Sequence, residues 1–211
     1  MRKKAPVFVF LMFCVVLSSL SAIDVNDTML MNQPAISKNH VAFIYAEDLW
    51  VADVDGGNAR RLTTVRGLES DPIFSPDGKW IAFSAQYDGN TDVFLIPVTG
   101  GIPKRLTWHP GPDLVRDFTP DGSSVLFLSP RYVFTNRYMQ LFTVSTEGGF
   151  PEKLPIPNAY RAKYSDDGTR IAYTPLVEPF HQWKRYRGGR VSKIWIYTIS
   201  DHSVIEIPQP E

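Results

Sequence analysis

The chain has 211 residues, of which 44% are hydrophobic and 21% charged, a composition typical of one globular domain. Its 22 basic and 22 acidic side chains give a formal net charge of zero. This balance argues against a general nucleic-acid-binding protein, which needs a positive field to displace counterions from phosphates.

Residues 1–22 have the layout of a secretory signal peptide. A basic start at residues 2–4 precedes an apolar run over residues 7–17, and small residues follow. The run is short for a membrane-spanning helix, although an uncleaved anchor is the alternative and would be the chain's one contact with a membrane. Cleavage would also remove Cys14, the only cysteine, and so exclude disulfides. We expect the mature chain to be secreted or periplasmic.

The rest of the sequence repeats itself. Three segments align closely, and a fourth is weaker because it lacks their Asp-Gly pair: 72-PIFSPDGKWIAFSA-85, 116-RDFTPDGSSVLFLS-129, 161-RAKYSDDGTRIAYT-174 and 35-AISKNHVAFIYA-46. Each is followed by a second pair of apolar runs, as in 92-DVFLIPVTGGIPKRLT-107. The Asp-Gly pairs recur with spacings of 44 and 46 residues, which makes each repeat one structural unit.

Each repeat is expected to form four short strands. Pro and Gly in Ser-Pro-Asp-Gly preset a tight turn, and the flanking runs are rich in aromatic and β-branched residues. Four strands in about 40–45 residues are typical of a β-propeller blade. Blades would cover one another with side chains such as Trp80, Phe83 and Phe94.

We therefore predict an all-β fold, a β-propeller of four-stranded blades similar to WD40 and TolB repeats. A linker at 23–34 would precede a propeller at 35–211, with blades at about 35–70, 71–115, 116–159 and 160–208. Propellers have roughly four to eight blades. We expect these four to belong to an incomplete six-bladed ring, and closure at four is the alternative.

The Asp-Gly pairs are expected to be structural turn residues: Asp77, Gly78, Asp121, Gly122, Asp167 and Gly168. The sequence contains no Gly-x-Ser-x-Gly elbow, phosphate-binding loop or dinucleotide fingerprint. Its four histidines are far apart and none has a partner at metal-ligand spacing. We therefore assign no catalytic residue, metal or cofactor.

One insertion stands out, 175-PLVEPFHQWKRYRGGRVS-192, between the second and third strands of the last repeat. Guanidinium groups bind carboxylates and stack on aromatic rings, and propeller insertions gather where ligands or domains dock. The candidate docking residues are Trp183, Lys184, Arg185, Tyr186, Arg187 and Arg190. The alternative is a loop whose cations pair with nearby acids. Arg116 is a further candidate, facing either the central channel or a neighbouring blade.

The segments 75-SPDGKWIAF-83 and 183-WKRYRGGRVSKIWIY-197 resemble the start of tricorn-type proteases. The resemblance covers about residues 33–208. It implies the N-terminal six-bladed propeller of a large serine peptidase, whose catalytic residues lie in later domains. It also implies contacts with peptides and with the remaining domains, and a homo-oligomeric parent. In the archaeal type, which is cytosolic, two adjacent arginines hold a peptide carboxylate, whereas the matching connection here has Arg116 alone.

A second interpretation keeps the same fold. The Ser-Pro-Asp-Gly repeats also resemble TolB-like propellers, which implies a periplasmic protein-binding module with no enzymatic activity. The first interpretation predicts that these residues are part of a longer protease. The second predicts a module that acts alone.

Overall fold

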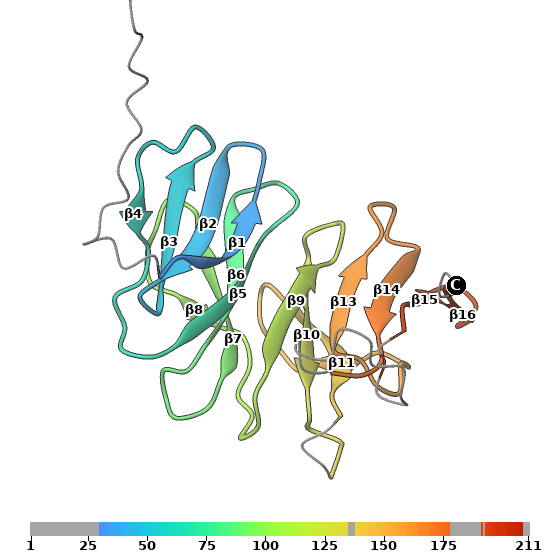
Figure 1. Ribbon diagram of the computed structural model, residues 1–211. Helices are drawn as coiled ribbons and strands as arrows, with labels where there is room; N and C mark the ends of the chain where they lie inside the picture. Colours follow the sequence, from blue (N-terminus) through green and yellow to red (C-terminus); the bar gives the residue numbers. More distant parts are fainter. Residues whose placement is uncertain (1–29, 135–137, 178–190, 192, 209–211) are drawn as a thin grey trace, which may run out of the picture.

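The computed structural model describes residues 30–134, 138–177, 191 and 193–208. Over these residues it contains sixteen strands and no helix, so nothing in this part is a helix that could cross a membrane. The strands form four antiparallel four-stranded sheets, each with its strands in chain order. The sheets follow one another around an arc, like the blades of a propeller (Figure 1). The expected all-β propeller fold is confirmed.

The four sheets have closely similar strand lengths. The first contains β1 (Asn32–Ile36), β2 (His40–Tyr45), β3 (Asp48–Asp53) and β4 (Arg60–Arg61). The second contains β5 (Glu69–Phe74), β6 (Trp80–Ala85), β7 (Asp92–Pro97) and β8 (Lys104–Arg105). The third contains β9 (Leu114–Phe118), β10 (Ser124–Ser129), β11 (Gln140–Ser145) and β12 (Glu152–Lys153). The fourth contains β13 (Arg161–Tyr164), β14 (Arg170–Thr174), β15 (Trp195–Thr198) and β16 (Val204–Glu206).

The first strands of the first and second sheets begin slightly earlier than the blade limits expected from the repeats. β1 begins at Asn32 rather than at residue 35, and β5 begins at Glu69 rather than at residue 71. In both strands the pairing with the next strand shifts register partway, between Asn32 and Ala35 and between Ser70 and Ile73. Because a bulge interrupts the alternation, the sequence pattern hides the residues that precede it.

The hydrophobic core lies in the seams between sheets. We call the side of a sheet that packs on the preceding sheet its leading face, and the opposite side its trailing face. Leading faces carry pairs of aromatic rings, such as Phe83–Phe94 and Phe127–Phe142, with ring centroids 5.9 and 5.8 Å apart. Trailing faces carry smaller aliphatic side chains, and each seam encloses one buried cluster. Trp80 is 40% exposed and lies outside this pattern, because it begins β6 at the sheet's end.

The Asp-Gly turns join β5 to β6, β9 to β10 and β13 to β14. In the last one, Asp167 accepts hydrogen bonds from the Ser165 hydroxyl (2.6 Å) and the Thr169 amide (3.0 Å). Gly168 has φ +69°, and a Cβ placed there would lie 3.3 Å from Cγ of Pro120 in the preceding turn. A Cβ at Gly122 would likewise lie 3.5 Å from Pro76. Each turn is thus nested against the turn before it.

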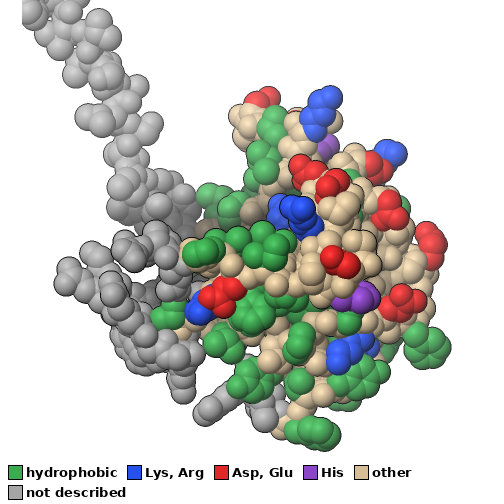
Figure 2. Space-filling view, turned by 90° about the vertical axis from the view of Figure 1, so that its right-hand side faces the viewer, with side chains coloured by type: hydrophobic (Ala, Val, Ile, Leu, Met, Phe, Trp, Pro, Cys, Tyr) green, Lys and Arg blue, Asp and Glu red, His purple; other side chains and the backbone are tan. Residues whose placement is uncertain are grey.

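Two faces of the arc are not covered by another sheet of the described residues: the leading face of the first sheet and the trailing face of the fourth. Figure 2 faces the side of the molecule that holds the fourth sheet, where hydrophobic side chains gather among charged ones. Ile194 and Ile205 on this sheet are 54% and 59% exposed. On the first sheet, Met31 and Val54 are 58% and 52% exposed.

We predict that the Asp167 carboxylate stabilises its turn only when it is ionised. Hydrogen bonds from Ser165 and Thr169 lower the pKa of Asp167 to about 2. A carboxyl whose folded-state pKa is lowered contributes stability above its unfolded pKa, and this contribution is lost as the pH falls towards 2. Asp167→Asn should therefore lower the thermal unfolding midpoint at pH 7, and the two midpoints should approach each other as the pH falls from about 4 towards 2. A difference that stays constant with pH would contradict this.

Candidate binding site along the inner strands

The first strands of the four sheets, β1, β5, β9 and β13, contact one another in order and form the inner side of the arc (Figure 1). Two of them are bulged at a residue that precedes proline. Gln33 has φ 51° and Asp71 has φ 52°, a left-handed conformation that costs about 1–3 kcal/mol outside glycine. The repeated bulge brings polar groups of neighbouring strands together on the inner side.

A line of polar contacts runs across these strands. The Asp71 amide donates to Oε1 of Gln33, which joins the second sheet to the first. Asp71 Oδ1 lies 3.2 Å from Arg116 Nη1 in the third sheet. Arg116 Nε in turn donates to the carbonyl oxygen of Tyr160, at 2.8 Å, just before β13. The Arg116 guanidinium therefore links the second, third and fourth sheets, and Gln33 extends the line of contacts to the first sheet.

Arg116 is held as a structural cation. Its side chain is only 12% exposed, and the guanidinium carbon lies 5.7 Å from the centroid of the Tyr160 ring. Burial lowers the pKa of Arg116, and the Asp71 carboxylate opposes that shift. A third bond, from Nη1 to the Val115 carbonyl, adds to its contacts. Of the two positions expected for Arg116, the structure shows contacts with neighbouring blades.

A cavity of about 590 Å³ lies over these strands. Its lining includes the Asp71 carboxylate, the Tyr160 ring and three cations, Arg116, Arg161 and Lys163. Cations and an aromatic ring suit an anionic or peptide-like ligand bound by hydrogen bonds and stacking. In the described part of the chain, no cluster of three or more His, Cys, Asp or Glu residues could hold a metal ion.

The other candidate docking residues cannot be placed. Residues 178–190 and 192 lie outside the described residues, and this segment contains Trp183, Lys184, Arg185, Tyr186, Arg187 and Arg190. Their docking role stays a prediction. The six turn residues lie in the nested turns, which join the first and second strands of the second, third and fourth sheets.

Sequence reasoning missed a second set of polar contacts, which lies in the seams. Glu69 is 4% exposed at the start of the second sheet, and its Oε2 accepts from the Thr63 hydroxyl and the Leu49 amide of the first sheet, both at 2.6 Å. Burial raises the pKa of Glu69, and these hydrogen bonds oppose the rise. The sequence signal that could have predicted these contacts is the repeated Arg-Leu-Thr at residues 61–63 and 105–107.

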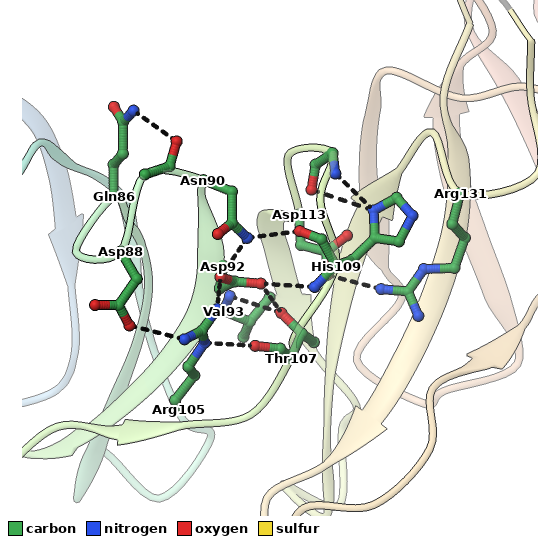
Figure 3. A network of polar contacts seen from close by, with 12 residues as sticks. Gln86, Asp88, Asn90, Asp92, Val93, Arg105, Thr107, His109, Asp113 and Arg131 are labelled. Carbon is green, nitrogen blue, oxygen red and sulfur yellow. Dashed lines mark hydrogen bonds and ion pairs between the residues drawn. The ribbon is translucent and has the colours of Figure 1, made fainter.

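The next seam repeats the arrangement with a larger network (Figure 3). The Thr107 hydroxyl accepts from the Val93 amide at 3.0 Å, and Arg105 pairs with Asp88 at 2.9 Å and also with Asp92. Asp113, which is fully buried, pairs with Arg131 Nη2 at 2.7 Å. Burial raises the pKa of Asp113, and bonds from Ser129 and Arg131 oppose it. Most of these contacts lie within one sheet, and the Val115 amide of the third sheet donates across the seam to the Ser84 hydroxyl of the second at 2.8 Å.

The fourth sheet carries the same kind of strand-to-strand ion pair with its charges exchanged. Asp48 and Arg61 pair at 2.8 Å in the first sheet, and Asp92 with Arg105 in the second. At the matching positions of β16 and the residue before β15, Lys193 pairs with Glu206. The acid and the base have thus changed places between the third and fourth strand regions.

We predict that Asp71 and Arg116 are energetically coupled. Arg116→Met leaves a partly buried carboxylate without its cation and should cost about 1–3 kcal/mol of unfolding free energy. A double-mutant cycle with Asp71→Asn should give a coupling of at least about 0.5 kcal/mol. The exposed pair of Lys79 and Asp77 is the control, and Lys79→Met should change stability by less than about 0.5 kcal/mol. Equal losses at the two sites in denaturant unfolding would contradict the inter-sheet role of Arg116.

Comparison with known proteins shows that the chain is similar to the N-terminal propeller domains of tricorn proteases. The family model for the tricorn protease N-terminal beta propeller domain matches residues 28–211. The putative tricorn protease homolog 2 of Streptomyces coelicolor is 34% identical over 175 residues, which are 78% of this chain and 15% of that protein. A putative Tricorn-like protease N-terminal subunit of Sulfurisphaera tokodaii is 29% identical over 160 residues, 74% of this chain and 80% of that one.

The solved structures agree on the fold. The crystal structure of the tricorn protease superposes with a TM-score of 0.73 at 25% identity, over 86% of this chain and 18% of that one. TolB from Acinetobacter baumannii superposes with a TM-score of 0.67 at 24% identity, over 83% of this chain and 43% of that one. The chain spans 15% and 16% of the two Streptomyces relatives that it matches.

Proposed function

The chain belongs to the family of tricorn protease N-terminal β-propeller domains, and we propose that it is the non-catalytic propeller portion of an exported tricorn-like serine peptidase. The observation that carries the proposal is the family match over residues 28–211, which takes in all four sheets. Its task would be to guide peptides towards a catalytic part located elsewhere and to dock that part. Its place would be outside the cytoplasm, a proposal supported by the signal-peptide pattern expected at residues 1–22.

The inner-strand cavity supports a role in peptide passage. Its cations and the Tyr160 ring offer ligands for the carboxylates and aromatic groups of a peptide. Arg116 is already bound to Asp71 and Tyr160, so we assign peptide contact to the exposed Lys163 and treat Arg116 as its support. The described residues hold polar groups in structural bonds, which suits a scaffold better than a reaction centre.

A TolB-like binding module is the second candidate. It is favoured by a local match to the Tol-Pal system protein TolB of Desulfosudis oleivorans, 29% identical over 70 residues, which are 31% of this chain. That match is much shorter than those to the tricorn relatives. In this case the chain would bind a protein partner by itself and would need no protease domains.

The length of the native product separates the two candidates. An antibody raised against residues 23–211 should detect, in the cells that make the protein, a band several times heavier than 23.9 kDa. The heavier band follows from the chain's small share of its Streptomyces relatives. A band near 23.9 kDa would instead favour the TolB-like module.

We also predict that the purified chain hydrolyses no peptide. The family resemblance puts the catalytic residues in other domains, so a library of fluorogenic peptides should give no signal above buffer. The control is the same preparation after heat unfolding, which should be indistinguishable. Hydrolysis that follows the folded chain through two unrelated purification steps would overturn the non-catalytic assignment.

A further inference from the structure

A cavity of about 580 Å³ lies in the seam between the second and third sheets, beside their Asp-Gly turns, and we call it the turn cavity. These two sheets are neighbours in the arc and share one buried cluster (Figure 1). The lining includes the buried side chains of Leu95 and Phe118. The turn cavity shares no lining residue with the inner-strand cavity, and its volume lies in the range of about 300–1,000 Å³ that is usual for ligand sites.

The Trp80 side chain points into this seam. Side chains alternate between the two faces of a strand, so Trp80 lies on the same face of β6 as Ala82 and Ser84. Ala82 belongs to the buried cluster of this seam, and the Ser84 hydroxyl accepts from the Val115 amide of the third sheet at 2.8 Å. Trp80 therefore faces the third sheet, where it lines the turn cavity and stays 40% exposed.

The blade itself does not require a tryptophan at this position. In every sheet the amide of the turn serine or threonine donates to the carbonyl oxygen of the residue that begins the second strand, which identifies the equivalent residues as His40, Trp80, Ser124 and Arg170. Polar side chains fill the position in the other three sheets. The half-exposed indole ring of the second sheet is thus available to a ligand, and its face attracts a cation.

Two carboxylates of the third sheet line the same cavity. Asp121 Oδ1 accepts hydrogen bonds from the Thr119 hydroxyl at 2.6 Å and from the Ser123 amide at 3.0 Å. Hydrogen bonds from these two residues lower the pKa of Asp121, so this carboxyl stays ionised at neutral pH. The Glu147 side chain is 92% exposed, and its Oε2 lies 3.8 Å from Lys104 Nζ, which leaves it free to turn towards a ligand.

The other two charged residues of the lining already have partners. Lys104 Nζ donates to the carbonyl oxygen of Thr146 at 2.9 Å. The Asp77 carboxylate lies 3.2 Å from Lys79 Nζ. The charge that the turn cavity offers to a ligand is therefore negative.

The preceding seam contains an equivalent cavity with a different chemistry. This cavity of about 830 Å³ is lined by the corresponding turns of the first and second sheets. Backbone bonds from the turn to the residue after the third strand align Thr99 with Glu147, just as His40 aligns with Trp80. The aromatic ring and the exposed acid are thus both missing there, and two lysines join the lining instead. The repeat supplies the hollow, and the residues of the second and third sheets supply its preference for a cation.

We propose that the turn cavity binds an arginine side chain presented by a separate polypeptide. The guanidinium plane stacks on the Trp80 ring and pairs with the carboxylates of Asp121 and Glu147. The methylene groups of the arginine lie against the apolar part of the lining. This interaction goes beyond the proposed function, which places peptide contacts in the inner-strand cavity and assigns them to a cation of this chain.

The test measures binding of acetyl-arginine methylamide to the exported gene product by ligand-observed NMR. Binding should be saturable and should change the tryptophan fluorescence of the protein. The citrulline analogue has nearly the same shape without the charge, and it should bind at least about tenfold more weakly, as should the glutamate analogue. Equal affinities for the arginine and citrulline compounds would overturn the proposal, as would the absence of saturable binding.

Two variants locate the site. Trp80→Ala removes the stacking surface, and Glu147→Lys replaces an attractive charge by a repulsive one, so each should weaken binding at least about tenfold. Glu147 is exposed, so circular dichroism of Glu147→Lys should show unchanged folding. Glu152→Lys is the matched control, because it makes the same charge change at an exposed residue of the third sheet outside the lining, and it should leave binding unchanged.

Arginine binding that survives either Trp80→Ala or Glu147→Lys would overturn the proposal, and so would an equal loss of binding in Glu152→Lys. The proposed function is judged by other results, the native length and the lack of peptide hydrolysis. Failure of the turn cavity to bind arginine would therefore leave that function as it stands.

Discussion

Within the part of the chain that the structure describes, each sheet is covered only by neighbouring sheets, and this constraint governs the rest of the structure. A four-stranded sheet has two faces and no helix of the described residues to protect either one. The buried clusters therefore form between sheets, and the apolar core residues take their role from the seam in which they lie. The seams share one pattern, aromatic rings on the leading face and aliphatic side chains on the trailing face, although the residues differ from seam to seam.

The polar groups fix the position of one sheet relative to the next across these apolar seams. Glu69 and Asp113 are buried carboxylates whose pKa values burial raises; Glu69 accepts from donors on the preceding sheet, and Asp113 pairs with Arg131 of its own sheet. Arg116 does the same on the inner side, where its cation joins three sheets. A sheet displaced along its neighbour would lose these bonds. The displacement is unfavourable because a charged group that stays buried without its partner costs free energy. The structural demand on Arg116 also explains why it is poorly placed to act as a mobile ligand.

The repeats made the fold predictable from the sequence, whereas the contacts between repeats could not be predicted from it. Ser-Pro-Asp-Gly turns and alternating strands are local signals, so strand order and blade number followed from residues close in sequence. Arg116 reaches Tyr160 and Asp71, about one repeat away on either side, and no local pattern encodes either contact. The bulges at Gln33 and Asp71 hid the starts of β1 and β5 for the same reason. The insertion carried the strongest family signal, yet it lies mostly outside the described residues.

The exchanged ion pair of the fourth sheet has a consequence for how similar strands find the right partners. Four near-copies of a hairpin in one chain invite a strand of one repeat to pair with the wrong repeat, a familiar failure of repetitive sequences. If the region of β3 paired with β16, Asp48 would face Glu206, and a β4 partner for β15 would set Arg61 beside Lys193. Like charges repel in both cases. The exchanged charges of the Lys193–Glu206 pair thus disfavour pairing between strands of the fourth sheet and strands of the first.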